Sequence, residues 1–137
     1  MHATKKDSEV RWMIVGMGTD IAEIDRVAGA IRRHGQAFLK RVFTEAEIRY
    51  CERHKAKDER YAARFAAKEA MMKALGTGWR KGVRWRDIEV RNAVSGKPEI
   101  FLAGEAEKHA ARLSARHFHV SITHSGNLAL AQVILED

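Results

Sequence analysis

The sequence predicts an α+β fold, a single domain with a largely antiparallel sheet packed against helices. In the first half, one short apolar run precedes three segments whose apolar residues recur at helical spacing. In the second half, four short segments are apolar or alternate with the period of a strand, and a helical segment separates the two pairs. Short turns join the strands within each pair, and strands joined in this way run antiparallel.

Length and charge limit the class of protein. The 137 residues suit one domain that can bury a hydrophobic core. The formal net charge of +7 favours an acidic partner, whether nucleic acid, a phosphorylated small molecule or an acidic protein. The single cysteine cannot form an internal disulfide, and no apolar run is long enough to span a bilayer, so we expect a cytoplasmic protein. Residues 1–12 are polar and aperiodic, which indicates a loose N-terminal extension before a domain at residues 13–137.

The domain is expected to open with a strand and a helix. Residues 13–19, MIVGMGT, form a short apolar run with two glycines, which predicts a strand. Asp20 follows at the point where the strand should give way to a helix, and its carboxylate suits an N-cap. Gly35 is expected to end this helix. The helix itself is indicated by the spacing of Ile21, Ile24, Val27, Ala28 and Ile31.

Two further helices complete the first half. Thr44 and Glu47 have the spacing of a capping box, in which each side chain satisfies a backbone N–H at the helix start. They predict a helix over residues 45–54. Asp58 is a candidate cap for the next helix, which ends at Gly76 because glycine turns left-handed at little cost.

The second half is expected to contain two hairpins. Residues 87–92 and 98–102 flank the turn-rich link AVSGK, which predicts the first. Residues 104–115 have a helical composition. Residues 117–124 and 128–136 form the second hairpin around the turn SGN.

The third helix carries the charged residues that draw most interest. Glu69 and Lys73 are four residues apart and share a face. The simpler interpretation is a stabilising pair that contributes roughly 0.2–0.5 kcal/mol. The alternative is that Glu69 and the distant Asp20 converge on a divalent cation such as Mg²⁺, which takes one or two carboxylates and leaves other positions to water and phosphate. Spacing leaves both interpretations open. A separate apolar stripe on this helix can pack inward, and it comprises Phe65, Met72 and Leu75.

Two other patterns suggest ligands without establishing them. The glycines of GMGTD resemble part of a dinucleotide fingerprint, but Ile21 stands where a third small residue is required, and no parallel βαβ unit follows. None of the seven histidines has the spacing of a zinc site. His124 and Ser125 could serve a phosphate, although a histidine at the end of a strand more often makes ordinary hydrogen bonds.

Basic residues occur along the first helix and just after it. A solvated face is the usual explanation of such a run. Arg26 and Arg33, however, are seven residues apart and project from nearly the same side, where they could meet acidic groups on a partner.

Five segments in order resemble the holo-acyl-carrier-protein synthase family, the small bacterial type of the phosphopantetheinyl transferase superfamily. They are GMGTDIAEIDRV, FTEAEI, RFAAKEAMMKALGTG, SGKPEIFL and HVSITHSGNLALAQVILE. The resemblance covers residues 13–136 and is most specific in the third segment. It implies a phosphopantetheinyl transferase-like fold and a homotrimer that binds coenzyme A between neighbouring subunits, so that HVSITHS completes the site of an adjacent chain.

The implied activity is the Mg²⁺-dependent transfer of the 4'-phosphopantetheine arm from coenzyme A to a serine of apo acyl carrier protein in fatty acid biosynthesis. Adenosine 3',5'-bisphosphate is released. By matching positions, Asp20 and Glu69 are the metal ligands, and Lys73 assists the diphosphate or the leaving group. Glu69 could also accept the serine proton, directly or through a water.

The resemblance also implies roles in binding. The adenosine 3'-phosphate would be met by a basic pocket, which comprises Arg64, Lys68, His124 and Ser125. Backbone close to the ligand, and the shape of the nucleotide end, would come from Gly76, Thr77, Gly78 and Pro98, for which a plain helix stop and a plain turn are the alternatives. Arg26 and Arg33 would dock the acidic carrier protein.

A function of another class is a basic nucleic-acid-binding module. Tryptophans lie among arginines in WRKGVRWRD, residues 79–87, where stacking and phosphate contacts could combine. No nucleic-acid-binding motif accompanies this segment.

Overall fold

The computed structural model describes residues 12–137, so the predicted extension at residues 1–12 lies, apart from Trp12, outside the described residues. One strand is followed by three helices, a single turn of 3₁₀ helix (η1), two strands, a helix and two strands. In chain order these are β1 (Ile14–Glu23), α2 (Ile24–Val42), α3 (Glu45–Glu52), α4 (Lys57–Leu75), η1 (Trp85–Asp87), β2 (Ile88–Asn92), β3 (Pro98–Leu102), α5 (Gly104–Arg112), β4 (His117–Ser125) and β5 (Leu128–Glu136). Within the described residues, no helix combines the length and apolar character that crossing a membrane requires.

All the strand pairs are antiparallel, as predicted, but they form two sheets rather than one. The first sheet has the order β1-β5-β4, and the second is the β2-β3 hairpin. In the first sheet, Asp20 of β1 lies opposite Ala131 of β5, which in turn lies opposite Ile122 of β4. This register sets the distance between Asp20 on β1 and the C-terminal residues of β4.

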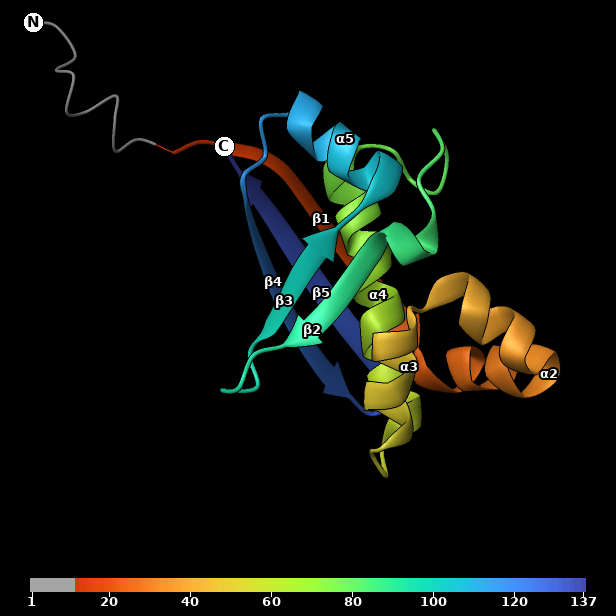
Figure 1. Cartoon of the computed structure of the whole chain (residues 1–137). Helices are drawn as coiled ribbons and strands as arrows, with labels where there is room; N and C mark the ends of the chain where they lie inside the picture. The colour runs from red at the N-terminus through yellow and green to blue at the C-terminus, as the bar shows by residue number, and fades with distance from the viewer. Residues whose placement is uncertain (1–11) are drawn as a thin grey trace, which may run out of the picture.

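Helix α4 is the centre of the fold. Figure 1 shows it running through the middle of the molecule, with the three-stranded sheet on one side and α2 on the other. Most of its residues are buried, and small alanines allow the sheet to approach closely. Its fully buried alanines are Ala62, Ala66, Ala67 and Ala70. Because most of α4 is buried, its polar side chains can reach solvent or a ligand only where no neighbouring element covers the helix.

The two glycines of β1 have a packing role. A Cβ added at Gly18 would lie 1.9 Å from the carbonyl oxygen of Ala70, and one at Gly16 would lie 2.3 Å from that of Ala74. Only glycine therefore allows the β1 backbone to lie directly on the α4 backbone. This contact, rather than a phosphate cradle, accounts for the glycine pair of GMGTD.

The first strand and helix differ from the predicted boundaries. β1 continues to Glu23, so Asp20 lies within the strand and is not an N-cap. The backbone leaves helical geometry at Gly35, with φ 53° and ψ −133°, as the predicted stop implies. A second helical segment then continues to Val42. β1 is longer than its local apolar pattern predicts, because its last residues pair with β5.

The capping predictions are confirmed in part. The Thr44 hydroxyl accepts from Glu47 N, and Glu47 Oε1 accepts from Thr44 N, which completes the capping box of α3. Gly76 ends α4 in the left-handed conformation, with φ 76°. The N-cap of α4, however, is Ala56, and Asp58 lies inside the first turn, where its charge favours the helix dipole without capping.

Candidate active site

Asp20 and Lys73 meet where β1 crosses α4. The Lys73 ammonium donates to Asp20 Oδ1 at 2.8 Å and to the Thr19 carbonyl oxygen at 3.0 Å. Its hydrogen bond to Asp20 is the main reason that the pKa of Lys73 is raised. Lys73 thus reaches across to β1, so the simple pairing with Glu69 along the helix is not its main contact.

Glu69 completes a cluster with these two residues. Burial raises the pKa of Glu69 to about 7, its hydrogen bond with Asp20 and the negative charge of Asp20 add to the shift, and the Lys73 ammonium opposes it. The neighbouring negative charge disfavours the ionised form of Glu69, because like charges repel. The fold therefore brings together two acids that are 49 residues apart in the sequence.

The donor set suits Mg²⁺. Within the described residues, no three histidine, cysteine, aspartate or glutamate side chains gather in a way that could hold a metal ion. The available ligands are the two carboxylates Asp20 and Glu69, and Mg²⁺ is typically bound by one or two carboxylates together with waters and substrate phosphates. Burial and the neighbouring Asp20 raise the pKa of Glu69, and a cation bound between the two carboxyl groups would favour their ionised forms.

The Glu69 carboxyl predicts a pH dependence of stability. Its pKa is about 7 in the folded protein and near 4.5 in the unfolded chain, so the folded state keeps a proton that the unfolded state loses between these values. Stability therefore falls as pH rises through this window. Because Glu69 is only half-buried, solvent screening reduces the expected loss to about 1–2 kcal/mol.

The measurement is urea unfolding between pH 5 and 8 without divalent cations. Wild type should lose more unfolding free energy over this range than Glu69→Gln, whose side chain does not titrate. Parallel pH profiles for the two proteins would show that Glu69 titrates normally.

An open cleft of about 930 Å³ lies next to Glu69. It runs between the end of β1 and α2, and Arg26 and Arg33 line it together with Glu69. Both arginines are exposed, and Arg26 also pairs with Glu23 at 3.3 Å. The apolar part of the cleft comprises Ile21, Phe38 and Phe65, among other residues. The predicted docking arginines therefore border the same cleft as the predicted metal ligand.

Lys68 does not fit the predicted phosphate pocket. Its side chain is fully buried and pairs with Glu47 Oε1 at 2.7 Å. Its ammonium also donates to the carbonyl oxygens of Trp85, at 3.1 Å, and Ile88. These three acceptors use all the donors of the ammonium, and burial lowers the pKa of Lys68. Lys68 is a structural residue that ties α4 to α3 and β2, and the expectation of a phosphate contact is corrected.

Arg64 lies on a different face of α4 from Glu69. Its Nη2 donates to Asn92 Oδ1 at 2.6 Å, and its guanidinium carbon lies 4.0 Å from the centre of the Tyr50 ring. Pro98 pairs with Asn92 across the β2-β3 hairpin, so the structure brings Arg64 and Pro98 into one region. No local spacing in the sequence links Tyr50 and Asn92 to Arg64, so neither contact could be predicted from the sequence.

His124 and Ser125 lie far from the carboxyl pair of their own chain. Ile122 lies two strands across the sheet from Asp20, and His124 is two residues further along β4. Standard strand spacing puts His124 roughly 10 Å across and 7 Å along from Asp20. Its Nε2 lies 3.7 Å from Glu59 Oε2, beside the N-terminal half of α4. One chain alone therefore does not assemble all the predicted site residues.

The GTG segment after α4 has a complete local explanation. Gly76 N donates to the Lys73 carbonyl oxygen, and Thr77 N to that of Met72, as at many helix C-termini. The buried Thr77 hydroxyl donates to the Gly78 carbonyl oxygen at 2.8 Å. These bonds support the plain helix stop.

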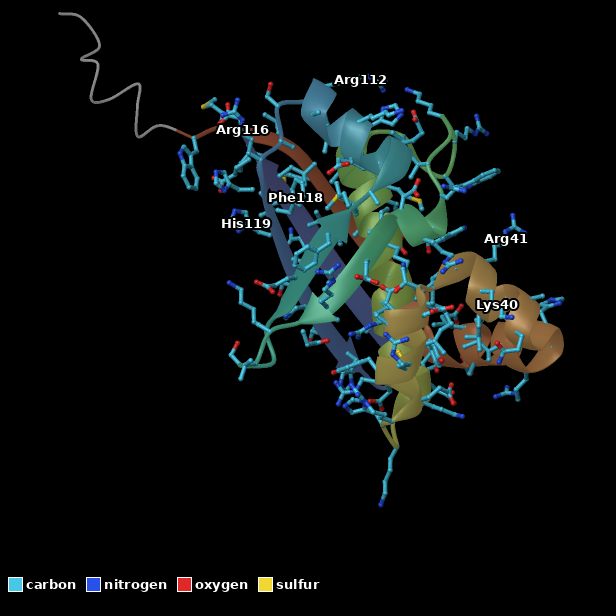
Figure 2. The ribbon with its side chains drawn as sticks, in the orientation of Figure 1. Lys40, Arg41, Arg112, Arg116, Phe118 and His119 are labelled. Atoms are coloured by element: carbon cyan, nitrogen blue, oxygen red, sulfur yellow. The ribbon has the colours of Figure 1, made fainter. Side chains whose placement is uncertain are left out.

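The unassigned WRKGVRWRD segment forms part of a second cleft, of about 570 Å³. Lys40 and Arg41, labelled at the end of α2 in Figure 2, line it together with Arg84 and Arg86. Trp85 lines its wall and stacks on Phe65 with ring centres 4.8 Å apart. This basic cleft is separate from the carboxyl pair.

Comparison with known proteins identifies the class. The chain belongs to the 4'-phosphopantetheinyl transferase superfamily, whose model matches residues 16–133. Within that superfamily it resembles holo-[acyl-carrier-protein] synthases, which confirms the resemblance seen in the motifs. The synthase of Solibacter usitatus is 55% identical over 125 residues, and the synthase of Koribacter versatilis is 50% identical over 125 residues. Each alignment covers 91% of this chain and 100% of the relative.

Solved structures confirm the predicted fold. The holo-[acyl-carrier-protein] synthase of Neisseria meningitidis has a TM-score of 0.84 at 34% identity, and the match covers 91% of this chain and 100% of that one. The synthase of Bacillus anthracis, solved in complex with CoA (3',5'-ADP), has a TM-score of 0.75 at 41% identity and covers 90% and 97%.

Proposed function

We propose that this chain is a cytoplasmic holo-acyl-carrier-protein synthase of fatty acid biosynthesis. It transfers the 4'-phosphopantetheine arm of coenzyme A to a serine of apo acyl carrier protein and depends on Mg²⁺. The observation that carries this proposal is the Asp20–Glu69 carboxyl pair beside Lys73, in a chain up to 55% identical to synthases of this name. The coenzyme A complex of the Bacillus anthracis protein supports the co-substrate.

The chemistry follows from charge neutralisation and positioning. The serine oxygen attacks the phosphorus that carries pantetheine, the bond from that phosphorus to the oxygen of the departing nucleotide breaks, and adenosine 3',5'-bisphosphate leaves. Asp20 and Glu69 would hold Mg²⁺, which supplies positive charge for the diphosphate. The Lys73 ammonium, 2.8 Å from Asp20, would donate to the phosphate oxygens or the leaving group.

Glu69 is also the candidate base for the serine proton. A pKa of about 7 suits a group that must accept a proton near neutral pH. A bound cation would lower this pKa, so in the Mg²⁺-loaded protein the assignment depends on the position of Glu69 beside the site, from which it would accept the proton directly or through a water.

Nucleotide recognition is assigned to other parts of the chain. Arg64 would meet the adenosine 3'-phosphate, and Pro98, at the start of β3, would shape the nucleotide end of the site. Backbone near Gly76 and Thr77 would lie close to the ligand. Lys68 is left out, because its three donors are used in the core.

We also propose a homotrimer. Met17 and Ile21 are 56% and 55% exposed, and they point to the same side of β1. Opposite them in β5 lie Ile134 and Leu130, so one face of the sheet is apolar and suits an interface. In such an assembly, His124 and Ser125 would serve a neighbouring subunit. Sedimentation at the mass of a single chain would contradict this assembly.

Docking of the acidic carrier yields a kinetic prediction. Arg26→Glu should raise the KM for carrier protein about tenfold or more and leave the KM for coenzyme A nearly unchanged, because the new carboxylate repels an acidic surface. Steady-state kinetics in each substrate measures both constants.

A charge-matched control is Arg112→Glu on α5. Figure 2 shows Arg112 at the end of α5, far from the end of α2 where Lys40 and Arg41 are labelled. This variant should keep both KM values. A larger rise for coenzyme A than for carrier protein in Arg26→Glu would count against the docking assignment.

The proposed reaction is tested directly by mass spectrometry. Apo acyl carrier protein, coenzyme A and Mg²⁺ are incubated with the protein, and the carrier should gain the mass of one phosphopantetheine. Addition of EDTA should prevent the gain. No gain with several carriers, together with salt-sensitive binding to nucleic acid, would instead support the nucleic-acid-binding module.

A further inference from the structure

The first turn of α2 has no side-chain cap of its own. Glu23 occupies the N-cap position, and within the described residues its side chain makes no capping hydrogen bond. It pairs instead with Arg26 at 3.3 Å. The first N–H groups of a helix have no partner inside the helix, so their hydrogen bonds come from elsewhere. The start of α2 therefore depends on another segment of the chain.

That segment is the turn between β4 and β5. Ile24 N donates to the Asn127 carbonyl oxygen at 2.8 Å, and Asp25 N donates to Asn127 Oδ1 at 3.0 Å. The Asn127 amide also donates through Nδ2 to Asp25 Oδ1. A single asparagine, 102 residues further along the chain, thus holds the first turn of α2 by its backbone and by both polar atoms of its side chain.

The geometry of the hairpin places Asn127 at this point. Ser125 and Leu128 pair across β4 and β5, so the loop between the strands has two residues. Gly126, the first of them, has φ 56°, which suits glycine and is typical of a type II′ turn. Leu128 also pairs with Glu23, the last residue of β1. Asn127 is therefore in register with the point where β1 becomes α2.

The asparagine side chain matches its partner on both sides. An amide offers one acceptor and one donor group, which fit the N–H and the carboxylate of Asp25. Aspartate at this position would set two carboxylates against each other. Alanine would leave only the bond from Ile24 N to the backbone carbonyl oxygen. Loss of a capping side chain destabilises the start of a helix, so the amide matters for the first turn.

Arg26 lies on this anchored turn. Its side chain is 82% exposed, and it lines the cleft that also contains Glu69. Among the first three residues of α2, Ile24 is buried, whereas Asp25 and Arg26 are exposed. Contact with the core therefore holds one side of the turn, and Asn127 holds the exposed side that carries Arg26.

We propose that Asn127 is a positioning residue for carrier docking. It fixes the first turn of α2, so that Arg26 stays at the edge of the cleft beside Glu69. The inference rests on the proposed function, because that function supplies the acidic carrier protein. It adds to the determinants of carrier affinity a residue that does not itself line the cleft.

Calorimetric titration with apo acyl carrier protein, without coenzyme A or Mg²⁺, tests this role. Asn127→Ala removes the side chain and keeps the backbone bond to Ile24. It should weaken carrier binding about threefold to tenfold, as expected for the loss of one or two hydrogen bonds. Binding of coenzyme A, titrated separately, should stay unchanged because the backbone of the turn is retained.

Exchange of the two side chains gives a rescue. Asn127→Asp sets a carboxylate against that of Asp25, and it should bind the carrier at least as weakly as Asn127→Ala. In the double variant Asp25→Asn, Asn127→Asp, the amide and the carboxylate change places and the net charge is that of wild type. Carrier binding should then return to within about twofold of wild type. Asp25→Asn should improve carrier binding more in the Asn127→Asp background than in wild type, which separates rescue from a simple loss of negative charge.

Ser95→Ala is the matched control. Ser95 Oγ also accepts from a backbone N–H at an exposed hairpin turn, that of Lys97 at 3.4 Å, but no helix begins there. This variant should bind the carrier like wild type. Hydrogen exchange provides a second readout: the Asp25 amide should exchange faster in Asn127→Ala, while amides in the second half of α2 keep their wild-type rates.

The results that would overturn the positioning role are distinct from those that would refute the synthase. Wild-type carrier affinity in Asn127→Ala, equal losses for carrier protein and coenzyme A, or a double variant that binds no better than Asn127→Asp would each overturn the role. Phosphopantetheine transfer by the same wild-type preparation tests the synthase. Carrier binding that depends on Asn127 without any transfer would refute the synthase and leave the positioning role standing.

Discussion

Asp20→Ala and Glu69→Ala should each lower kcat/KM for phosphopantetheine transfer about a thousandfold while the fold remains intact. Removal of one preorganised electrostatic contact at a reacting centre typically costs about a hundredfold to a thousandfold, and here the change would also weaken the proposed metal site. The measurement is the transfer rate at several Mg²⁺ concentrations, with circular dichroism to follow the fold. Part of the lost rate should return at high Mg²⁺, because one carboxylate remains in each variant.

The structure explains why Glu69→Ala should fold. Glu69 is a half-buried acid whose pKa is raised, so its ionised form weakens the folded state and its removal should not lower stability at pH 8. Glu107→Ala, at an exposed position of α5, is the control for loss of one surface carboxylate. Wild-type transfer rates in both site variants would refute the metal assignment.

Gly18→Ala should have the largest effect on stability. The added Cβ would lie 1.9 Å from Ala70 O and 2.8 Å from Ala74 N, which are backbone atoms of the central helix. Neither can move without shifting α4 from β1, so we expect a loss of about 3 kcal/mol in unfolding free energy. Because Asp20 lies two residues further along β1, transfer activity should fall as well. Urea unfolding and transfer kinetics measure the two effects.

Gly29→Ala is the contrasting substitution. A Cβ at Gly29 would meet the flexible ends of Arg33, at 3.2 Å, and Arg32, at 3.9 Å, and the residue lies inside α2. Alanine in a helix interior restricts the unfolded chain, so stability should stay the same or rise by about 0.5–1 kcal/mol. Comparable losses in the two variants would show that the close contact of β1 with α4 is not what requires Gly18.

Local signals in the sequence identified most of the elements. The Thr44–Glu47 capping box and the left-handed Gly76 were predicted correctly, because each depends on hydrogen bonds within a few residues. The two hairpins also follow from short turns between alternating segments. The length of β1 was underestimated, since its last residues are held by pairing with β5, which is distant in sequence.

The candidate site was predictable only through motifs. The resemblance pointed to Asp20, Glu69 and Lys73, and the fold brings these three together. It also pointed to Lys68, for which the prediction was wrong. Lys68 is next to Glu69 in the sequence, but neighbouring residues on a helix point in different directions. The Lys68 side chain points into the core.

By itself, the sequence determined the α+β class, the caps and turns, the basic charge and the family, because each is encoded in short patterns or in residue types at ordered positions. The tertiary structure alone decided which charges are buried and which meet. It joined Asp20 to Glu69 through the glycine contact of β1 with α4, enclosed Lys68 with Glu47, and set Tyr50 and Asn92 against Arg64. The physical reason is that burial and long-range electrostatics depend on distances in space, which the spacing of residues along a chain does not specify.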